Sequence, residues 1–538
     1  MHKKNHLADQ LFLQLKQIGI KQIFGIPGDE LEIFDALGHS GIKFITTRHE
    51  QAAAFMAQAV GKVSRLPGVC ISTLGPGATN LATGVADAHQ NRSPVLVLSG
   101  QMPTQFHKSN PHAHQYIDLQ SMFKPITKAV FKISNARSMQ SVIEKAIQTS
   151  LSGRPGPVHV TLPVNIMEKE VTVKSNKRPI NIKFKSPKTS IQEINRTIEL
   201  LNKSKYPIAF FGQRALYAHK NFIKLLRRAN IPVMTSFLGK GSFPEGDQIS
   251  LGTISRHIKD SLVDLVKRAD LFIIVDYDYI EGVNSAIFNN RKVIYIDSVS
   301  SKIDKQIKPS LELVGDVTGI TQKLARKMLA KNYKTNWNVH LIKETHAKRY
   351  NQILSVQKFE SFPINPYKIM QELQKVTTGN EVIVSDVGNH KQALALGYNV
   401  NKPMSVHFSN GLSSMGFSVP FCAGLRFAMP KNKKIISIVG DGGFLMNVQE
   451  LETITRYNLD IKIIVYVDNA FGMIKANLLQ KYKRVRNLDF TNPDFLYLAK
   501  SFGIKHLQVN SKKDLPIKLK SLVSTKGTTL LSIPVKYS

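Results

Sequence analysis

The sequence predicts an α/β protein of three domains, each a doubly wound parallel sheet. Apolar runs of strand length alternate with helix-like stretches along nearly the whole chain, the pattern of parallel strands joined by crossover helices. The length of 538 residues suggests about three domains of 100–200 residues each. Two polar, lysine-rich stretches, residues 168–190 and the partly helical 331–362, divide the chain as linkers. We therefore expect domains at 1–170, 190–335 and 363–538.

The predicted strands fall into three groups that match these domains. They are IKQIF (20–24), IKFITT (42–47), GVCIST (68–73), PVLVL (94–98) and PVHVTL (157–162); PIAFF (207–211), LFIIV (271–275) and KVIYI (292–296); and NEVIVSD (380–386), KIISIV (434–439), IKIIVYV (461–467) and TTLLSIPV (528–535). Between them, residues 50–65 are predicted to form a helix whose Ala and Gly residues permit close packing. A second helix is predicted over 443–458.

Composition excludes several classes of protein. The apolar fraction of 42% is enough for packed cores and excludes a disordered chain. No apolar run has the length of a membrane span, and the basic N-terminus leads into an amphipathic helix, not a signal peptide. Cys70 and Cys422 stand in apolar surroundings and are expected to be buried thiols in a reducing compartment. We expect a cytoplasmic protein without a membrane partner.

The net charge of +35 is unusual. One interpretation is binding to nucleic acid or to a membrane surface. The lysines are scattered along the whole length, however, and no basic helix with interleaved aromatic residues is present. A solvated, lysine-rich surface is therefore favoured, with a positive field that helps to attract anionic substrates.

Two acidic residues follow neighbouring strands in the last domain. The strand at 434–439 runs into Gly440-Asp441-Gly442, and the strand at 461–467 ends at Asp468-Asn469-Ala470, so the two acids are 27 residues apart. Ligands of parallel sheets gather beyond the carboxyl ends of the strands. Glycines and a helix N-terminus favour a phosphate, and two carboxylates with a backbone carbonyl suit a divalent cation. A bare Gly-Asp-Gly is often only a turn, but this context favours a cation and diphosphate site.

This arrangement resembles the motif of thiamine-diphosphate-dependent enzymes, in which GDG is followed by a closing NN or ND pair. Here the closing pair is Val467-Asp468. The resemblance implies that Asp441, Asp468 and the carbonyl of Ala470 hold Mg²⁺. It also places the cofactor beside Gly440, Gly442, Gly443, Phe471, Gly472 and Met473.

Three segments of the first domain resemble the cofactor-side segments of the same superfamily: FGIPG (24–28), RHEQAAAFMAQA (48–59) and STLGPGATN (72–80). A lone glutamate at a helix start is usually a partner of the helix dipole. In thiamine chemistry, a carboxylic acid in an apolar site promotes the imino tautomer that removes the thiazolium proton. The resemblance implies this role for Glu50. It also implies contacts with the cofactor from Gly25, Pro27, Gly28, Thr73, Gly75, Pro76 and Asn80.

In this superfamily the glutamate and the metal motif come from different subunits, which implies a homodimer or homotetramer. The segment 113–128 resembles the substrate side, with Gln115 near the reacting carbons. The segment 409–420 resembles the aminopyrimidine-binding stretch, with Asn410, Gly411 and the supporting Met415.

The middle-domain tract IIVDYDYIEG (273–282) lacks the arginine pattern of flavin-binding synthases. Together with 295–317 and 530–538, it resembles the catabolic, flavin-free acetolactate synthases, so FAD is not expected. The chain has Val164 where many synthases have Lys or Gln, and Asn477 where the catabolic form has a glutamine. Both positions lie on the side that receives the second substrate. His390 is either a pocket residue or a surface histidine. His107, His112 and His114 lie close together, but no ligand geometry is implied and we expect no metal there.

The resemblance implies decarboxylation of pyruvate and carboligation to a second 2-oxo acid, giving 2-acetolactate. The sister reactions stay open as alternatives: another 2-oxo acid decarboxylase, a pyruvate oxidase or a carboligase with a different acceptor. A basic nucleic-acid-binding protein on a retained cofactor fold is the alternative from another class.

Overall fold

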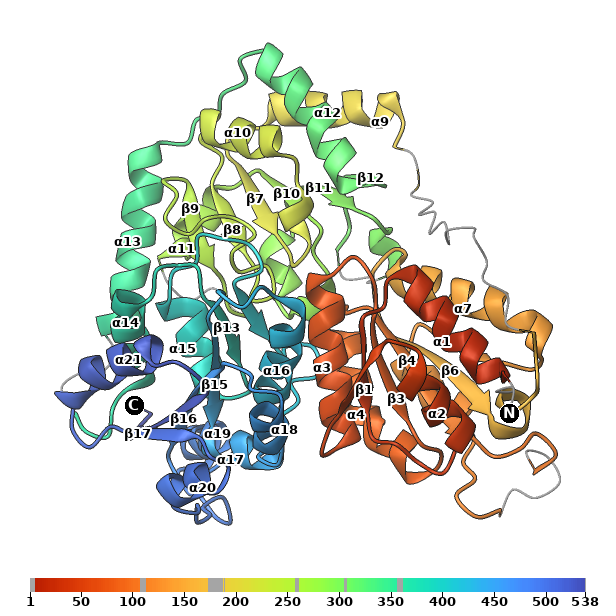
Figure 1. The fold of residues 1–538 in the computed structure, drawn as a ribbon. Coiled ribbons are helices and arrows are strands. Elements are labelled where there is room, and N and C mark those ends of the chain that lie inside the picture. Colours follow the sequence, from red (N-terminus) through yellow and green to blue (C-terminus); the bar gives the residue numbers. More distant parts are fainter. Residues whose placement is uncertain are drawn as a thin grey trace.

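The protein consists of three parallel sheets, each covered by helices (Figure 1). The structure, a computed structural model, describes residues 5–106, 113–172, 187, 189–256, 261–303, 307–355 and 361–537. Each sheet has six strands, and the strands pair in parallel throughout. The prediction of three α/β domains with doubly wound parallel sheets is confirmed. Most of the predicted linker at 168–190 lies outside the described residues. His107 and His112 also lie outside them.

The first sheet has the order β2-β1-β3-β4-β6-β5. Its strands are β1 (Gln22–Gly25), β2 (Lys43–Thr46), β3 (Gly68–Ser72), β4 (Val95–Gln101), β5 (Ala129–Lys132) and β6 (Val158–Pro163). Its helices are α1 (Leu7–Ile18), α2 (Leu31–His39), α3 (Glu50–Val63), α4 (Pro76–Gln90), α6 (Leu119–Phe123), α7 (Ala136–Leu151) and α8 (Val164–Met167).

The middle sheet has the order β12-β11-β10-β7-β8-β9. Its strands are β7 (Pro207–Phe211), β8 (Val233–Thr235), β9 (Ser250–Thr253), β10 (Leu271–Val275), β11 (Lys292–Asp297) and β12 (Leu311–Val314). Its helices are α9 (Ile191–Lys203), α10 (Lys220–Arg228), α11 (Leu262–Arg268) and α12 (Val317–Ala330), followed by α13 (Val339–Ser355). The stretch expected to be a partly helical linker thus contains a helix of 17 residues.

The third sheet has the order β14-β13-β15-β16-β18-β17. Its strands are β13 (Val382–Ser385), β14 (Val406–Phe408), β15 (Ile435–Gly440), β16 (Lys462–Val467), β17 (Lys505–Gln508) and β18 (Thr529–Pro534). Its helices are α14 (Pro366–Val376), α15 (Asn389–Gly397), α16 (Ser418–Ala428), α17 (Asp441–Met446), α18 (Glu450–Arg456), α19 (Gly472–Tyr482), α20 (Phe495–Ser501) and α21 (Asp514–Ser524).

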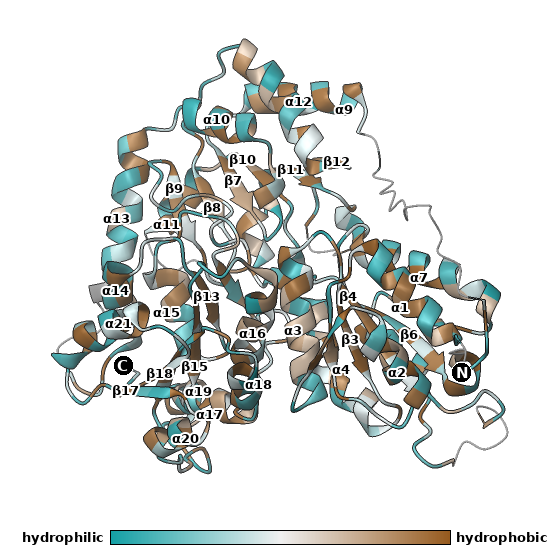
Figure 2. Ribbon diagram, viewed as in Figure 1, coloured by the Kyte–Doolittle hydropathy of each residue, from teal (hydrophilic) through white to brown (hydrophobic). Residues whose placement is uncertain are grey.

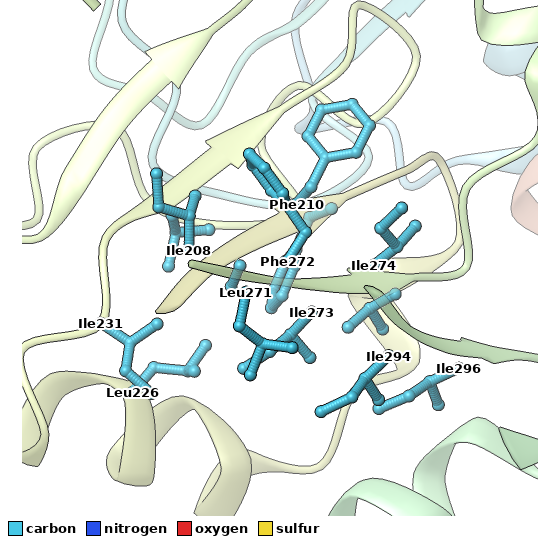
Figure 3. Close-up of a cluster of buried hydrophobic side chains, with 14 of the residues drawn as sticks. Ile208, Phe210, Leu226, Ile231, Leu271, Phe272, Ile273, Ile274, Ile294 and Ile296 are labelled. Carbon is cyan, nitrogen blue, oxygen red and sulfur yellow. The ribbon is translucent and has the colours of Figure 1, made fainter. Parts of the chain in front are cut away.

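Central strands of these sheets are apolar on both faces, because helices cover both sides. Every residue of β10 is buried, and Figure 3 shows its Phe272 and Ile274 with Phe210 of β7 and Ile294 of β11 in one cluster. Hydrophobic residues mark the strands of all three sheets, and hydrophilic ones appear on the surrounding helices (Figure 2). No helix in the described ranges is both long and apolar enough to cross a membrane.

The prediction of one continuous helix over residues 443–458 is wrong. The structure has two short helices, α17 and α18, with a break between them. Asn447 leaves the helical conformation at φ −134° and ψ 29°. Its side-chain amide donates to the carbonyl of Gly416 at 2.8 Å. This tertiary hydrogen bond outweighs the helical pattern of the sequence.

The first and third domains share one hydrophobic core. Helix α3 packs against α16 at the centre of Figure 1, and the rings of Phe55 and Phe417 meet edge to face at 5.5 Å. A Cβ atom on Gly424 of α16 would lie 2.4 Å from the carbonyl oxygen of Met56. Glycine therefore permits the close approach of the two helices.

We expect Gly424→Ala to force these helices apart, because an added methyl group overpacks the contact by about 1–3 kcal/mol. The apparent midpoint of thermal unfolding, followed by circular dichroism, should fall by at least about 2 °C. Gly38→Ala in α2 is the matched control, since nothing lies within 4 Å of a Cβ there. Equal midpoints for the two variants would contradict this account of the contact.

Candidate active site

Asp441 and Asp468 lie side by side at the carboxyl edge of the third sheet. Strands β15 and β16 are neighbours, with Gly440 paired to Tyr466, so both acids follow the same edge. The Oδ2 atom of Asp441 accepts hydrogen bonds from the backbone N–H of Asp468 at 3.2 Å and of Asn469 at 2.8 Å. The predicted proximity of the two acids is therefore present in the fold.

The loop after β16 is shaped around these carboxylates. A Cβ on Gly472 would lie 2.1 Å from Oδ2 of Asp468, so only glycine fits there. Ala470 is buried, and its carbonyl accepts from the N–H of Gly472 at 2.9 Å. Burial, together with the nearby Asp441, raises the pKa of Asp468 to about 7. A divalent cation between the two carboxylates would offset their repulsion, so these residues fit the ligand set that the resemblance implies.

The glycines of the 440–443 loop bring other predicted residues together. A Cβ on Gly442 would meet Phe471 at 3.3 Å and the methyl group of Met415 at 3.5 Å. A Cβ on Gly443 would lie 2.9 Å from Oδ1 of Asp386. Met415 thus faces the loop that carries Asp441. Met473 is partly buried in the first turn of α19.

His390 is buried, with 2% of its surface exposed, so the alternative of a surface histidine is wrong. Its ring contacts that of Tyr466, and a Cβ on Gly440 would lie 3.6 Å from the imidazole. Burial lowers the pKa of His390 to about 3, which leaves the ring neutral. Its Nε2 atom has no hydrogen-bond partner among the described residues. The ring donates to the backbone of Asp386, so the unpartnered Nε2 atom beside Gly440 is an acceptor that suits an O–H or N–H group of a ligand.

Glu50 begins α3 at the carboxyl edge of the first sheet and is 6% exposed. Its Oε2 accepts from the side-chain amide of Asn80 in α4 at 3.0 Å. A Cβ on Gly77 would lie 3.3 Å from Oε1, so a side chain at this position would crowd that oxygen. Asn80, predicted from the cofactor-side segment, thus orients the predicted glutamate.

The loops after β1 and β3 meet at the same edge. A Cβ on Gly28 would lie 2.2 Å from Thr73. Gly75 has φ +58°, and a Cβ there would lie 2.8 Å from Gln115, which is exposed. At this edge Gly25 ends β1, Pro27 follows it, Pro76 begins α4, and Val164 begins α8 directly after β6. The residues of the first domain that were predicted to face the cofactor therefore lie together at one edge of the sheet.

The stretch 409–415 joins the first and third domains. The backbone N–H groups of Asn410 and Gly411 donate to Oδ1 of Asn91 at 3.2 and 3.3 Å. Asn477 is exposed on α19. Within the described residues, no hydrogen bond or ion pair joins Glu50 to Asp441 or Asp468.

Comparison with known proteins gives this arrangement a family. Residues 5–122, 194–324 and 386–533 match the N-terminal TPP binding domain, the central domain and the C-terminal TPP binding domain of thiamine pyrophosphate enzymes. The chain is a thiamine pyrophosphate enzyme. A "Probable acetolactate synthase large subunit" from Methanococcus aeolicus is 34% identical, over 99% of this chain and 92% of the relative. The acetolactate synthase of Bacillus subtilis (strain 168) is 29% identical over 99% and 94%.

Three polar residues of this thiamine pyrophosphate enzyme were not singled out from the sequence. Asn492 donates through Nδ2 to Oδ2 of Asp441 at 2.8 Å. Glu30, 1% exposed, accepts from the N–H of Leu74 at 2.8 Å and from the hydroxyl of Thr73 at 3.1 Å. No local pattern marks either residue, because both act through contacts distant in sequence.

Glu450 is the third of these residues and links the two domains. It is fully buried in α18 and accepts from the N–H of Arg48 at 2.9 Å and from the N–H of His49. On the same helix, Arg456 donates to the carbonyl of Thr46 at 2.8 Å. Helix α18 of the third domain therefore holds the segment that leads into Glu50. The predicted helix 443–458 covered this residue without a signal for its role.

We expect Glu450→Gln to change the pH dependence of stability. Burial raises the pKa of Glu450 from 4.5 to about 7, so the folded protein keeps a proton that the unfolded chain loses. The wild-type protein therefore loses stability from this group as the pH rises from about 4.5 to about 7. Relative to wild type, the thermal midpoint of the variant should rise through this window and then level off.

Thermal scans between about pH 5 and pH 8 measure this difference. Glu452→Gln is the matched control, because its side chain is 38% exposed on the same helix and pairs with Arg456. If the difference in thermal midpoint between Glu450→Gln and wild type stays constant with pH, the raised pKa of Glu450 is contradicted.

Proposed function

We propose that the protein is a magnesium-dependent thiamine pyrophosphate enzyme that decarboxylates pyruvate and joins the two-carbon unit to a second 2-oxo acid, giving 2-acetolactate. The observation that carries this proposal is the pair of acids, Asp441 and Asp468, at adjacent strand ends, in a chain that also presents a buried Glu50. The names of the relatives support the reaction, since those cited are called acetolactate synthases and align along almost their whole length.

The residues of the third domain have separate tasks in this proposal. The carboxylates of Asp441 and Asp468 and the carbonyl of Ala470 would hold Mg²⁺, which in turn binds diphosphate oxygens. Asn492 fixes the orientation of the Asp441 carboxylate through its 2.8 Å hydrogen bond. His390 keeps a nitrogen free of protein partners next to Gly440. Because the other ring nitrogen donates to the backbone of Asp386, this nitrogen can accept a hydrogen bond from an O–H or N–H group of a ligand.

Thiamine diphosphate, when bound, supplies a nucleophilic thiazolium carbon and an electron sink for the loss of carbon dioxide. The carboxyl group of Glu50 would exchange a proton with the aminopyrimidine nitrogen of the bound cofactor, as general acid–base catalysis requires. Asn80 occupies Oε2 of this carboxyl group, and Gly77 presents no side chain to Oε1. Burial keeps water from competing for the proton.

A homodimer completes the proposed site. Helix α19, which follows the loop with Asp468, has no buried residue in the single chain. Ile474, Leu479 and Tyr482 of this helix are about half exposed, at 49%, 46% and 53%. Exposed apolar residues concentrated in this way mark an association surface. In the dimer, Glu50 of one chain would serve the cation site of the other.

The middle domain favours a reaction without FAD. In parallel sheets a dinucleotide binds at the carboxyl edge where the strand order reverses, here between β7 and β10. A Cβ on Gly212 would lie 2.3 Å from the carbonyl oxygen of Asp276, so the two strand ends leave little space. Arg214 pairs with Asp276 at 2.7 Å and with Asp297 at 3.6 Å across this edge. The chain's own ion pairs thus fill the crevice.

The matches to thiamine pyrophosphate enzymes favour an enzyme over the alternative of a nucleic-acid-binding protein on a retained cofactor fold. A sister reaction of the same superfamily is the alternative that experiment must separate. The cytoplasmic location stays a prediction from the sequence.

Product analysis tests the reaction. We expect the purified protein, incubated with pyruvate, thiamine diphosphate and Mg²⁺, to form 2-acetolactate as its main product, identified by mass spectrometry. Acetaldehyde as the main product would indicate a decarboxylase instead. Acetate, together with stoichiometric flavin in the purified protein, would indicate an oxidase and would also contradict the flavin-free proposal.

Mixed dimers test the shared site. We expect Glu50→Gln and Asp441→Asn each to reduce turnover at least about 100-fold, since each removes an essential group. A hybrid of the two variants, isolated through two different affinity tags, contains one intact site and should recover up to about half of the wild-type activity.

Thiamine diphosphate binding, measured by calorimetry, should persist in Glu50→Gln and weaken in Asp441→Asn. Glu199→Gln, on the exposed face of α9, is the control and should leave turnover unchanged. A hybrid as inactive as its two parents would show that Glu50 and Asp441 do not act across two chains.

A further inference from the structure

The stretch between β14 and α16, residues 409–417, has a conformation that its own sequence does not favour. It carries Met415, whose methyl group would lie 3.5 Å from a Cβ on Gly442 in the cation loop. Ser413 has φ +57° and Gly416 has φ +81°. A serine in the left-handed region is strained and stays there only where its surroundings hold it. The groups that hold this stretch therefore help to place Met415.

Two buried acids bind hydrogen-bond donors of this stretch and of the helix start that follows it. Asp87 of the first domain accepts from the hydroxyl of Ser409 at 2.5 Å. Asp386, which follows β13, accepts from the N–H groups of Gly416 at 3.1 Å and of Ser418 at 2.9 Å. Both acidic side chains are fully buried. The first and third domains thus each hold one end of the stretch.

Lys391 of α15 binds acceptors of the same stretch. Its Nζ atom donates to the carbonyl oxygen of Ser409 at 3.2 Å, to Oδ1 of Asn410 at 3.3 Å and to Oγ of Ser413 at 3.5 Å. The side chain is 8% exposed and forms no ion pair within 4 Å among the described residues. Because a buried lysine usually has a carboxylate partner, these three oxygens are its main compensation.

The charge of Lys391 is also balanced from a greater distance. Burial lowers the pKa of this lysine, and Asp87 and Asp386 oppose the shift, so that the pKa is about 8. The side chain is therefore mostly charged at pH 7, and hydrogen bonds from a charged donor are stronger than those from a neutral one. The lysine takes the oxygen acceptors of the stretch and the acids take its O–H and N–H donors.

We propose that Lys391 is a positioning residue for the cofactor: its ammonium group holds residues 409–413 and thereby fixes the position of Met415. The inference rests on the proposed function, because Met415 is the residue expected to support thiamine diphosphate. Lys391 acts through the stretch, since its printed hydrogen bonds all go to residues 409, 410 and 413. A stretch held in its binding conformation in advance loses less conformational entropy when the ligand binds.

Cofactor binding to the full-length protein, measured by calorimetry with Mg²⁺ and without pyruvate, tests this role. We expect Lys391→Met to raise the dissociation constant of thiamine diphosphate at least about fivefold, because the stretch is no longer held in place. The KM for pyruvate at saturating cofactor should change by less than about twofold. Lys375→Met is the matched control, since its side chain is 66% exposed on α14, and it should bind the cofactor as the wild type does.

A lower thermal midpoint with an unchanged dissociation constant would show that Lys391 only stabilises the fold, and would overturn the proposal. Lys391→Gln is the second variant, for use where Lys391→Met does not fold. It keeps N–H donors but removes the charge, so it should raise the dissociation constant to a smaller extent. Equal constants for Lys391→Gln and the wild type would also overturn the proposal.

The binding assay separates this inference from the proposed reaction. Because it contains no pyruvate, a product other than 2-acetolactate contradicts the proposed function and not the role of Lys391. A wild-type protein that binds no thiamine diphosphate would overturn both.

Discussion

The packing of α3 against α16 determines how the two functional domains are placed. Glu50 is the first residue of α3, and the glycine at position 424 brings α16 within backbone contact of that helix. Helix α18 also contacts the segment that precedes Glu50, because its Glu450 accepts a hydrogen bond from the N–H of Arg48. The catalytic carboxyl group proposed for the first domain therefore lies on elements that contact α16 and α18 of the third domain.

The fold class could be predicted because the buried strands of parallel sheets appear in the sequence as short, continuous apolar runs. Runs such as Leu271–Val275 are apolar at every position, as strands covered on both faces must be. Two of the strands that the sequence did not single out, β8 and β14, are only three residues long. Their pairing with longer neighbours defines them, and no local pattern does.

The residues of the candidate site also fall into two groups, those that could be predicted from the sequence and those that could not. Asp441, Asp468 and Glu50 follow strand ends or begin a helix, so their place was predictable once the strands were. Glu30, Glu450 and Asn492 could not be found in this way, because each contacts a segment distant in the chain. His390 is buried on α15, where its ring contacts that of Tyr466 of β16. Sequence spacing left that residue undecided between pocket and surface.

Helix α19 has a thermodynamic consequence for the assembly. It follows directly on Ala470 and Phe471, yet it buries none of its eleven residues in one chain, so packing within the chain does little to order it. In the proposed dimer, the partner's surface supplies that order, and the same loop contributes to the cation site. Cofactor affinity and subunit affinity are then linked functions: dilution weakens retention of the cofactor, and saturation with the cofactor tightens the dimer by the same free energy.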